Sequence, residues 1–245
     1  MSDPRPTVTA AGRHGAVRWG LGDAALGWVL AQLGGVVVAS IVLAINDGAV
    51  EDIDDLSLTW VAVAQVGLWL GMLGVPLVAA RLKGNGPVED YGLRSAGWDA
   101  PLGFAAGLGT QLLLIPLLYL PIFWFSDLDT GDLEDPARGL TDRATDPLGV
   151  TLLVLIVGIG APIIEEIFYR GLLQRALVRR FGVWPGILGS AALFGASHFQ
   201  LLQLPALVVF GIVLGLLAYR TGRLAAPIAA HIVFNMLTVV FLVGA

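Results

Sequence analysis

Long runs of apolar residues without any charge limit what this chain can fold into. Residues 24–45, 58–80 and 100–125 contain no Asp, Glu, Lys or Arg. Each run is longer than the about 20 helical residues that cross roughly 30 Å of hydrocarbon. The runs are continuous rather than alternating, so they predict helices, whose backbone hydrogen bonds stay within one segment, and not a β-barrel. A mean hydropathy of +0.81 also indicates a membrane protein.

Four further apolar stretches complete the prediction of the spans. They lie at about 148–175, 184–200, 204–219 and 224–243, and the second and third of them are short. We therefore predict an all-α, polytopic bundle with seven transmembrane helices. Glycines four residues apart occur in three places and favour close approach of helices. These pairs are Gly67/Gly71, Gly103/Gly107 and Gly211/Gly215.

The charges between the predicted spans alternate in sign along the chain. The connection 46–57 has five acidic residues and no basic one, and the connection 126–147 has seven acidic residues and two arginines. The N-terminal tail and the other connections are richer in Arg and Lys. By the positive-inside rule, this alternation predicts a multi-pass protein of the cell membrane with a cytoplasmic N-terminus. Pro136 and Pro147 argue against a continuous helix in 126–147, and no basic stripe indicates binding to nucleic acid.

Strongly polar residues within the predicted spans are confined to the second half of the chain. Glu165, Glu166 and Arg170 are the charged residues there, in a sequence with 19 acidic and 14 basic residues. A charge near the bilayer centre costs at least about 2.5 kcal/mol and usually faces the interior of a bundle or a water-filled cavity. Glu166 and Arg170 are four residues apart, so we expect them to form an ion pair. Glu165 points about 100° away on the same helix and has no such partner.

Two more pairs at helical spacing bring side chains that could act with Glu165. Phe194 and His198 are four residues apart, as are His231 and Asn235. A carboxylate and an imidazole can hold a water and take its proton, while a second imidazole and an amide N–H can stabilise an oxyanion. Alternatively, Glu165, His198 and His231 could bind Zn²⁺ with an open position for water. The chain has no cysteine and no HExxH pattern.

These residues form three short patterns in a fixed order. EEIFYR fits EExxxR, FGASH fits FxxxH, and HIVFN fits HxxxN. The chain in this way resembles the CAAX-protease and bacteriocin-processing family of intramembrane proteases, which includes the Rce1 type of prenyl-protein endopeptidase. The resemblance covers about residues 148–240. It implies a catalytic core at 148–245. The charges and apolar runs described above predict what precedes this core: a cytoplasmic tail at 1–23 and spans with acidic external loops at 24–147.

The resemblance also implies roles for the polar residues. Glu165 would activate the water, and His198 would hold that water. His231 and Asn235 would form the oxyanion site. The supporting residues would be Glu166 and Arg170, which orient the motif helix, and Phe194, which positions His198.

Cofactor, substrate and span number follow from the same resemblance. Family members are often labelled metalloproteases, but the Rce1 type is also described as a metal-independent glutamate protease, and we favour the mechanism without Zn²⁺. The substrate would be a peptide or membrane protein within the lipid bilayer, prenylated in the eukaryotic relatives. Eight spans are usual in the family, one more than the seven predicted here.

Two other classes of function are compatible with parts of the pattern. A non-catalytic scaffold or bacteriocin-immunity protein could share the fold, but such a protein would more often lack one of the motif residues. A proton-coupled transporter could use Glu165, His198 and His231 as a relay, but it would more often show a repeat and polar groups in both halves. Five tryptophans near the predicted membrane interfaces are interpreted as aromatic anchors. They are Trp19, Trp28, Trp60, Trp98 and Trp184.

Overall fold

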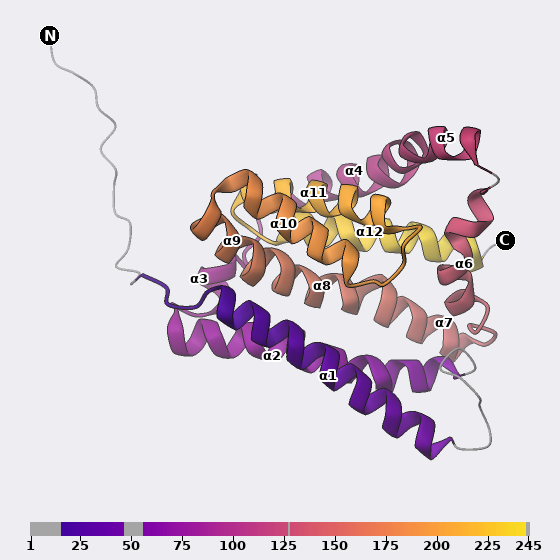
Figure 1. Ribbon diagram of the computed structural model, residues 1–245, viewed down its shortest axis with the longest axis horizontal. Helices are drawn as coiled ribbons and strands as arrows, with labels where there is room; N and C mark the ends of the chain where they lie inside the picture. The colour runs from indigo at the N-terminus through magenta and orange to yellow at the C-terminus, as the bar shows by residue number, and fades with distance from the viewer. Residues whose placement is uncertain (1–15, 47–55, 127, 244–245) are drawn as a thin grey trace, which may run out of the picture.

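The computed structural model describes residues 16–46, 56–126 and 128–243, and within these ranges it contains helices and no β-strand (Figure 1). In the described residues, six helical stretches are long and apolar enough to cross a membrane: α1 (Leu21–Ile45), α2 (Leu58–Lys83), α4 to α5 (Asp99–Phe125), α7 to α9 (Pro147–Phe181), α11 (Leu204–Thr221) and α12 (Ala225–Val243). A seventh apolar helix, α10 (Val183–Ala196), has only 14 residues. The predicted all-α bundle with about seven spans is therefore confirmed. Residues 1–15 of the expected tail lie outside the described ranges.

Two of the long stretches contain wider, π-helical turns. The first stretch consists of α4 (Asp99–Gly109), η2 (Thr110–Leu114) and α5 (Ile115–Phe125). The second consists of α7 (Pro147–Leu153), η3 (Val154–Gly160), α8 (Ala161–Glu166), η4 (Ile167–Leu173) and α9 (Gln174–Phe181). π-helical turns release carbonyls from the regular pattern and occur frequently at functional sites. Both glutamates of the motif lie at the end of α8, between two such turns.

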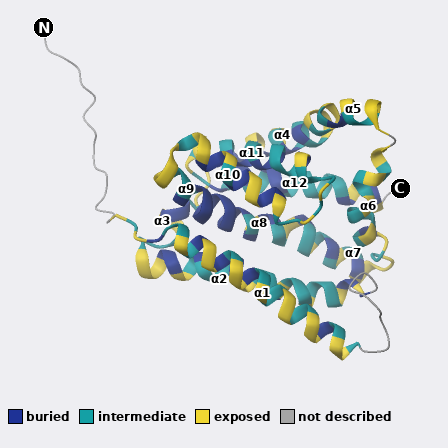
Figure 2. Ribbon diagram, viewed as in Figure 1, coloured by how far each residue is buried: buried dark blue, intermediate teal, exposed yellow. Residues whose placement is uncertain are grey.

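The three glycine pairs lie where helices cross most closely. A Cβ atom on Gly67 would overlap the carbonyl of Gly34, and one on Gly71 would overlap the backbone of Ala31. Consequently α1 and α2 pack backbone against backbone along much of their length. Gly103 and Gly107 pack in the same way against α12, whereas Gly211 contacts Ala191 of α10 and Gly215 contacts the side chains of Gln174 and Ile187. Figure 2 shows the result, with buried residues gathered in α8 and α9 and exposed residues on the outer faces of α1 and α5.

Basic side chains bind the backbone and an acid at the end of the bundle where α1 begins. Arg175 donates to the carbonyls of Tyr91, at the end of α3 (Pro87–Tyr91), and of Gly222. Arg223 holds the buried carboxylate of Asp99 through two hydrogen bonds of 2.7 Å. The hydrogen bonds and the negative charge of Asp99 raise the pKa of Arg223 above its ordinary value. These contacts join α3, α4, α9 and the α11–α12 connection.

The prediction that Trp19 is an aromatic anchor at the interface is wrong, because its side chain is only 3% exposed. Its Nε1 donates to Oδ2 of Asp90 at 2.8 Å, and its ring packs edge-on against Tyr91. The guanidinium of Arg179 lies over the same ring, 3.9 Å from its centre. The segment before α1 is therefore fixed to the bundle. Two other predicted anchors are exposed, as an anchor requires: Trp98 and Trp184.

The acidic connection after α5 contains a helix that its proline did not predict. Residues Thr130–Thr141 form α6, with Pro136 inside it. The side chain of Asp129 accepts from the N–H groups of the first turn, which stabilises the start of the helix. Helix α6 ends before Pro147, where α7 begins. In Figure 1, α6 runs across the end of the bundle opposite α3.

Candidate active site

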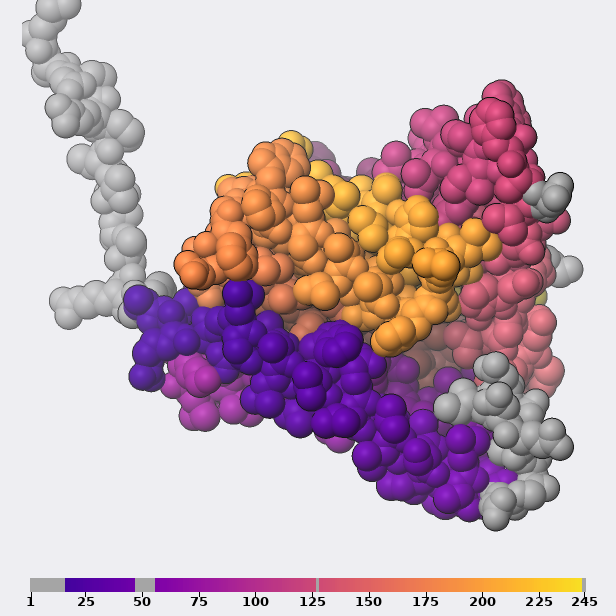
Figure 3. All heavy atoms as spheres, in the orientation of Figure 1, coloured from indigo at the N-terminus to yellow at the C-terminus, as the bar shows by residue number. Residues whose placement is uncertain are grey.

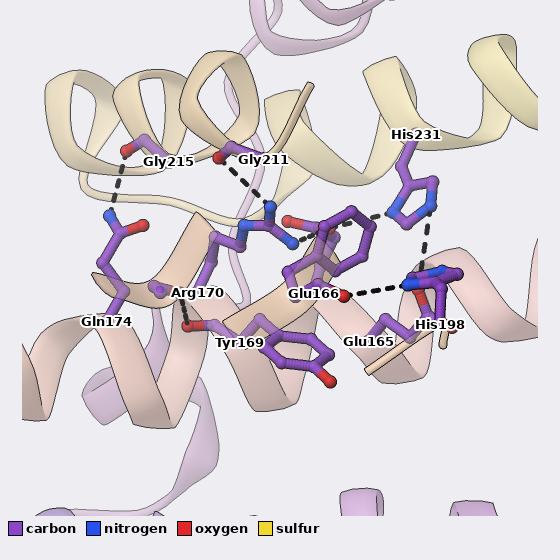
Figure 4. Close-up of polar contacts among 11 residues, drawn as sticks. Glu165, Glu166, Tyr169, Arg170, Gln174, His198, Gly211, Gly215 and His231 are labelled. Carbon is purple, nitrogen blue, oxygen red and sulfur yellow. Dashed lines mark hydrogen bonds and ion pairs between the residues drawn. The ribbon is translucent and has the colours of Figure 1, made fainter. Parts of the chain in front are cut away.

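Glu166 and Arg170 form the predicted ion pair in the centre of the bundle. Both side chains are fully buried, and NH1 of Arg170 donates to Oε1 of Glu166 at 2.8 Å (Figure 4). NH2 of Arg170 donates to the carbonyl of Gly211 at 3.2 Å, and the guanidinium lies 4.5 Å from the ring centre of Phe194. The two terminal nitrogens of the guanidinium thus bind a carboxylate and a carbonyl, and its face lies on an aromatic ring, but its Nε has no hydrogen-bond partner among the described residues. This arrangement fixes η4 against α10 and α11.

His231 on α12 lies between the two glutamates. Its Nδ1 is 2.9 Å from Oε1 of Glu166, and its Nε2 is 3.8 Å from Oε2 of Glu165. Because the Glu166 oxygen already accepts from Arg170, it is a charged acceptor, and we assign the Nδ1 proton of His231 to this hydrogen bond. The Nε2 atom then faces Glu165. The sequence leaves Glu165 without a partner on its own helix, and α12 supplies that partner.

His198 lies just after α10, in the turn that follows Ser197. Its Nδ1 is 2.8 Å from the carbonyl of Phe194, which can only accept, so Nδ1 carries a proton and Nε2 has a free lone pair in the neutral ring. The Phe194 ring packs edge-on against both imidazoles, with ring centres 4.9 Å from His198 and 5.6 Å from His231. Phe194 is therefore the side chain that separates and orients the two histidines. No hydrogen bond or ion pair joins His198 directly to Glu165 among the residues that the structure describes.

Asn235 donates to a backbone carbonyl whose helical N–H donor is missing because of a proline. Its Nδ2 donates to the carbonyl of Val157 at 2.8 Å. In η3 the N–H of Ala161 bonds to the carbonyl of Ile156, and the next residue, Pro162, has no N–H for Val157. The amide of Asn235 replaces the missing donor and ties α12 to η3. One N–H of the same amide remains for another acceptor.

The region that carries these residues matches a family model described as type II CAAX prenyl endopeptidase Rce1-like, over residues 147–237. The chain is also 32% identical over 199 residues to a Bacillus subtilis (strain 168) protein named "Putative membrane peptidase YdiL". That match covers 69% of this chain and 82% of the relative. The chain belongs to the Rce1-like family.

A second relative of this Rce1-like protein is an Escherichia coli protein named "Uncharacterized 24.3 kDa protein". It is 32% identical over 97 residues, which cover 38% of this chain and 45% of that relative. No solved structure matches the chain.

The alternative of a zinc site requires three protein ligands around one point. Within the described part of the chain, no group of three His, Asp or Glu side chains is arranged to hold a metal ion. The Nδ1 atoms of His198 and His231 bind a carbonyl and Glu166, so a metal could reach only the Nε2 atoms of the two rings. In this arrangement Glu165, His198 and His231 do not form the three-ligand group that Zn²⁺ needs.

Some polar contacts around the site were not predicted from the sequence. Gln174 continues the stripe of Glu166 and Arg170 at the same spacing of four, and its Nε2 donates to the carbonyl of Gly215 at 2.9 Å. This spacing, repeated in Gly211 and Gly215, is the signal that could have identified the residue. Ser190 donates to the carbonyl of Tyr169 in η4 at 3.0 Å. A serine in an apolar helix carries no comparable signal.

Proposed function

We propose that this Rce1-like protein is an intramembrane endopeptidase in which Glu165 activates the attacking water. The observation that supports this most is the position of Nε2 of His231, 3.8 Å from Oε2 of Glu165 in a helix bundle. The Glu165 side chain is 14% exposed, whereas Glu166 is fully buried. The Glu165 carboxylate can therefore contact water, while the Glu166 carboxylate is bound by an arginine and a histidine.

The charges of the cluster support a proton that moves between Glu165 and His231. In one state both glutamates are ionised and are balanced by Arg170 and a doubly protonated His231. In the other state Glu165 holds the proton and His231 is neutral. The net charge of these four side chains is zero in both states, and a cluster without net charge is the least costly one inside a membrane. The proton can thus change position without leaving an unpaired charge.

The first of these states has the groups that peptide hydrolysis needs. A water between Glu165 and Nε2 of His198 can donate to both, and Glu165 takes one of its protons as the oxygen attacks the carbonyl carbon. The Nε2–H of His231 and the free N–H of Asn235 can donate to the resulting oxyanion. When the C–N bond breaks, Glu165 returns its proton to the leaving amine. The products are a carboxylic acid and an amine, and the enzyme regains its starting state.

The substrate that we propose is a peptide or membrane protein with a prenylated, CAAX-type end. Family membership and the apolar outer faces of the bundle support a substrate that reaches the site within or beside the bilayer. We assign the end of the bundle with Arg175 and Arg223 to the cytoplasm, following the positive-inside rule. The N-terminus would then be cytoplasmic.

The test uses the purified protein in lipid vesicles with quenched fluorescent peptides, each with and without a farnesyl group. Wild type and Glu165→Ala are compared, with and without a strong chelator. We expect cleavage by the wild type, faster for farnesylated peptides, insensitive to chelator and lost in Glu165→Ala. Chelator-sensitive cleavage would replace the water-activating glutamate by a metal centre, and undiminished cleavage by Glu165→Ala would overturn the mechanism.

A further inference from the structure

The segment that carries His198 is held by few regular hydrogen bonds of its own. Helix α10 ends at Ala196, and the N–H groups of His198 and Phe199 reach carbonyls three residues back, in tight turns. Phe199 has a φ of 55°, in the left-handed region that a bulky residue rarely adopts. Its side chain is 75% exposed, so its own packing does not explain this conformation. Contacts from other elements must therefore stabilise the segment 197–203.

Those contacts come from α1, α5 and α6. On α1, Nε1 of Trp28 donates to Oγ of Ser197 at 3.0 Å. On α5, the hydroxyl of Tyr119 donates to the carbonyl of Leu202 at 2.5 Å. From the other direction, Nε2 of Gln203 donates to the carbonyl of Leu133 in α6 at 2.9 Å. Figure 3 shows the surface of α1 meeting that of the α10–α11 region.

The contact of Trp28 lies next to the histidine. Ser197 precedes His198, and its hydroxyl donates to the carbonyl of Leu193 at 2.7 Å while it accepts from Trp28. The indole N–H thus completes a chain of hydrogen bonds that fixes the last turn of α10. The carbonyl of Phe194, one residue further along that turn, accepts from Nδ1 of His198. A shift of this turn moves the imidazole. Trp28 is half-buried and its indole N–H is used by Ser197, so its role as an interfacial anchor stays a prediction.

We propose that Trp28 and Tyr119 are positioning residues that set the orientation of His198 for catalysis. The inference rests on the proposed function of His198, and it assigns a role to helices outside the matched region 147–237. The motif residues of the second half then form a complete site only with donors from α1 and α5. Loss of either donor leaves Glu165, His231 and Asn235 in place and lets His198 adopt other orientations. The expected effect is a lower kcat at an unchanged KM.

The experiment measures His198 both by spectroscopy and by activity. The chain has three histidines, so ¹⁵N-histidine labelling gives few signals, which His→Gln variants assign. In Trp28→Phe and in Tyr119→Phe, we expect the His198 signals to shift or broaden while those of His231 stay unchanged. The kcat should fall about five- to tenfold, which corresponds to one lost hydrogen bond. The matched controls are Trp98→Phe and Tyr219→Phe, whose side chains are exposed.

The two readouts separate this inference from the proposed function. Unchanged His198 signals in both variants, as in the controls, would overturn the positioning role whether or not a substrate is cleaved. Shifted His198 signals in a protein that cleaves no peptide would support the positioning role and count against the proposed function. Unchanged His231 signals show that a variant is folded. If Trp28→Phe does not fold, Ser197→Ala removes the same hydrogen bond from the other side.

Discussion

Replacing Arg170 by methionine should destabilise the fold far more than the same change in an exposed pair. Arg170 and Glu166 are both 0% exposed, and the substitution leaves the Glu166 carboxylate buried with only His231 as a partner. It also removes the donor to the carbonyl of Gly211 and the cation over the Phe194 ring. Breaking one side of a buried ion pair costs about 3–5 kcal/mol. We expect Arg170→Met to lower the free energy of unfolding by that amount.

The chain contains its own control for this prediction. Arg138 and Glu134 form an ion pair with the same residue types and the same spacing of four, but their side chains are 41% and 42% exposed. Exposed pairs of this kind contribute about 0.3–0.5 kcal/mol. Unfolding in mixed micelles with increasing SDS, followed by tryptophan fluorescence, measures both variants. Equal destabilisation by Arg170→Met and Arg138→Met would refute the argument from burial.

A double variant separates stability from activity at the same pair. Glu166→Gln together with Arg170→Met removes both charges, so no unpaired charge remains in the bundle. We expect the double variant to be more stable than Arg170→Met alone. Its cleavage should nevertheless stay low, because His231 has lost the charged acceptor that fixes its Nδ1 proton. Recovery of both stability and cleavage would show that Glu166 does not orient His231.

Three further predictions concern packing, the amide and metal. Gly71→Ala should lower the free energy of unfolding by about 1–3 kcal/mol because its Cβ would overlap Ala31, whereas a Cβ on Gly74 meets nothing within 4 Å and should be tolerated; SDS unfolding measures both. Asn235→Ala should cost about 1–3 kcal/mol in the same assay, since it leaves the carbonyl of Val157 without its donor. A loss below 0.5 kcal/mol, roughly the effect of an ordinary surface change, would contradict this. Removing metal ions with a strong chelator should leave the rate of peptide cleavage unchanged, and a large fall would contradict the metal-free mechanism.

The spans and one buried contact could be read from the sequence because each depends on local spacing. Runs of uncharged residues determine which segments can cross a membrane. The spacing of four places Arg170 over Glu166 in any helical turn, and the pair is present at 2.8 Å. The presence of Gln174 on the same stripe follows from the same rule. Each of these inferences depends on the spacing of residues within a single helix.

The contacts between helices could not be predicted, because they depend on how distant segments pack. The sequence does not show that His231 would face both glutamates, nor that Asn235 would supply the donor that Pro162 lacks. Trp19 has the sequence context of an interfacial anchor, yet it is buried and its indole N–H binds Asp90 inside the protein. Whether a tryptophan near a helix end is buried depends on the neighbouring helices. The roles of the motif residues in catalysis stay predictions.

The central claim is that the adjacent glutamates have different tasks, and one comparison tests it most directly. Glu165→Gln and Glu166→Gln each remove one charge with almost no change in shape, and both are measured for peptide cleavage and for SDS unfolding. We predict that Glu165→Gln stays as stable as the wild type and loses cleavage by about 10²- to 10⁴-fold, the usual contribution of a general base. Glu166→Gln should be clearly less stable, because it leaves Arg170 without its buried partner. Cleavage at the wild-type rate by Glu165→Gln would contradict the account.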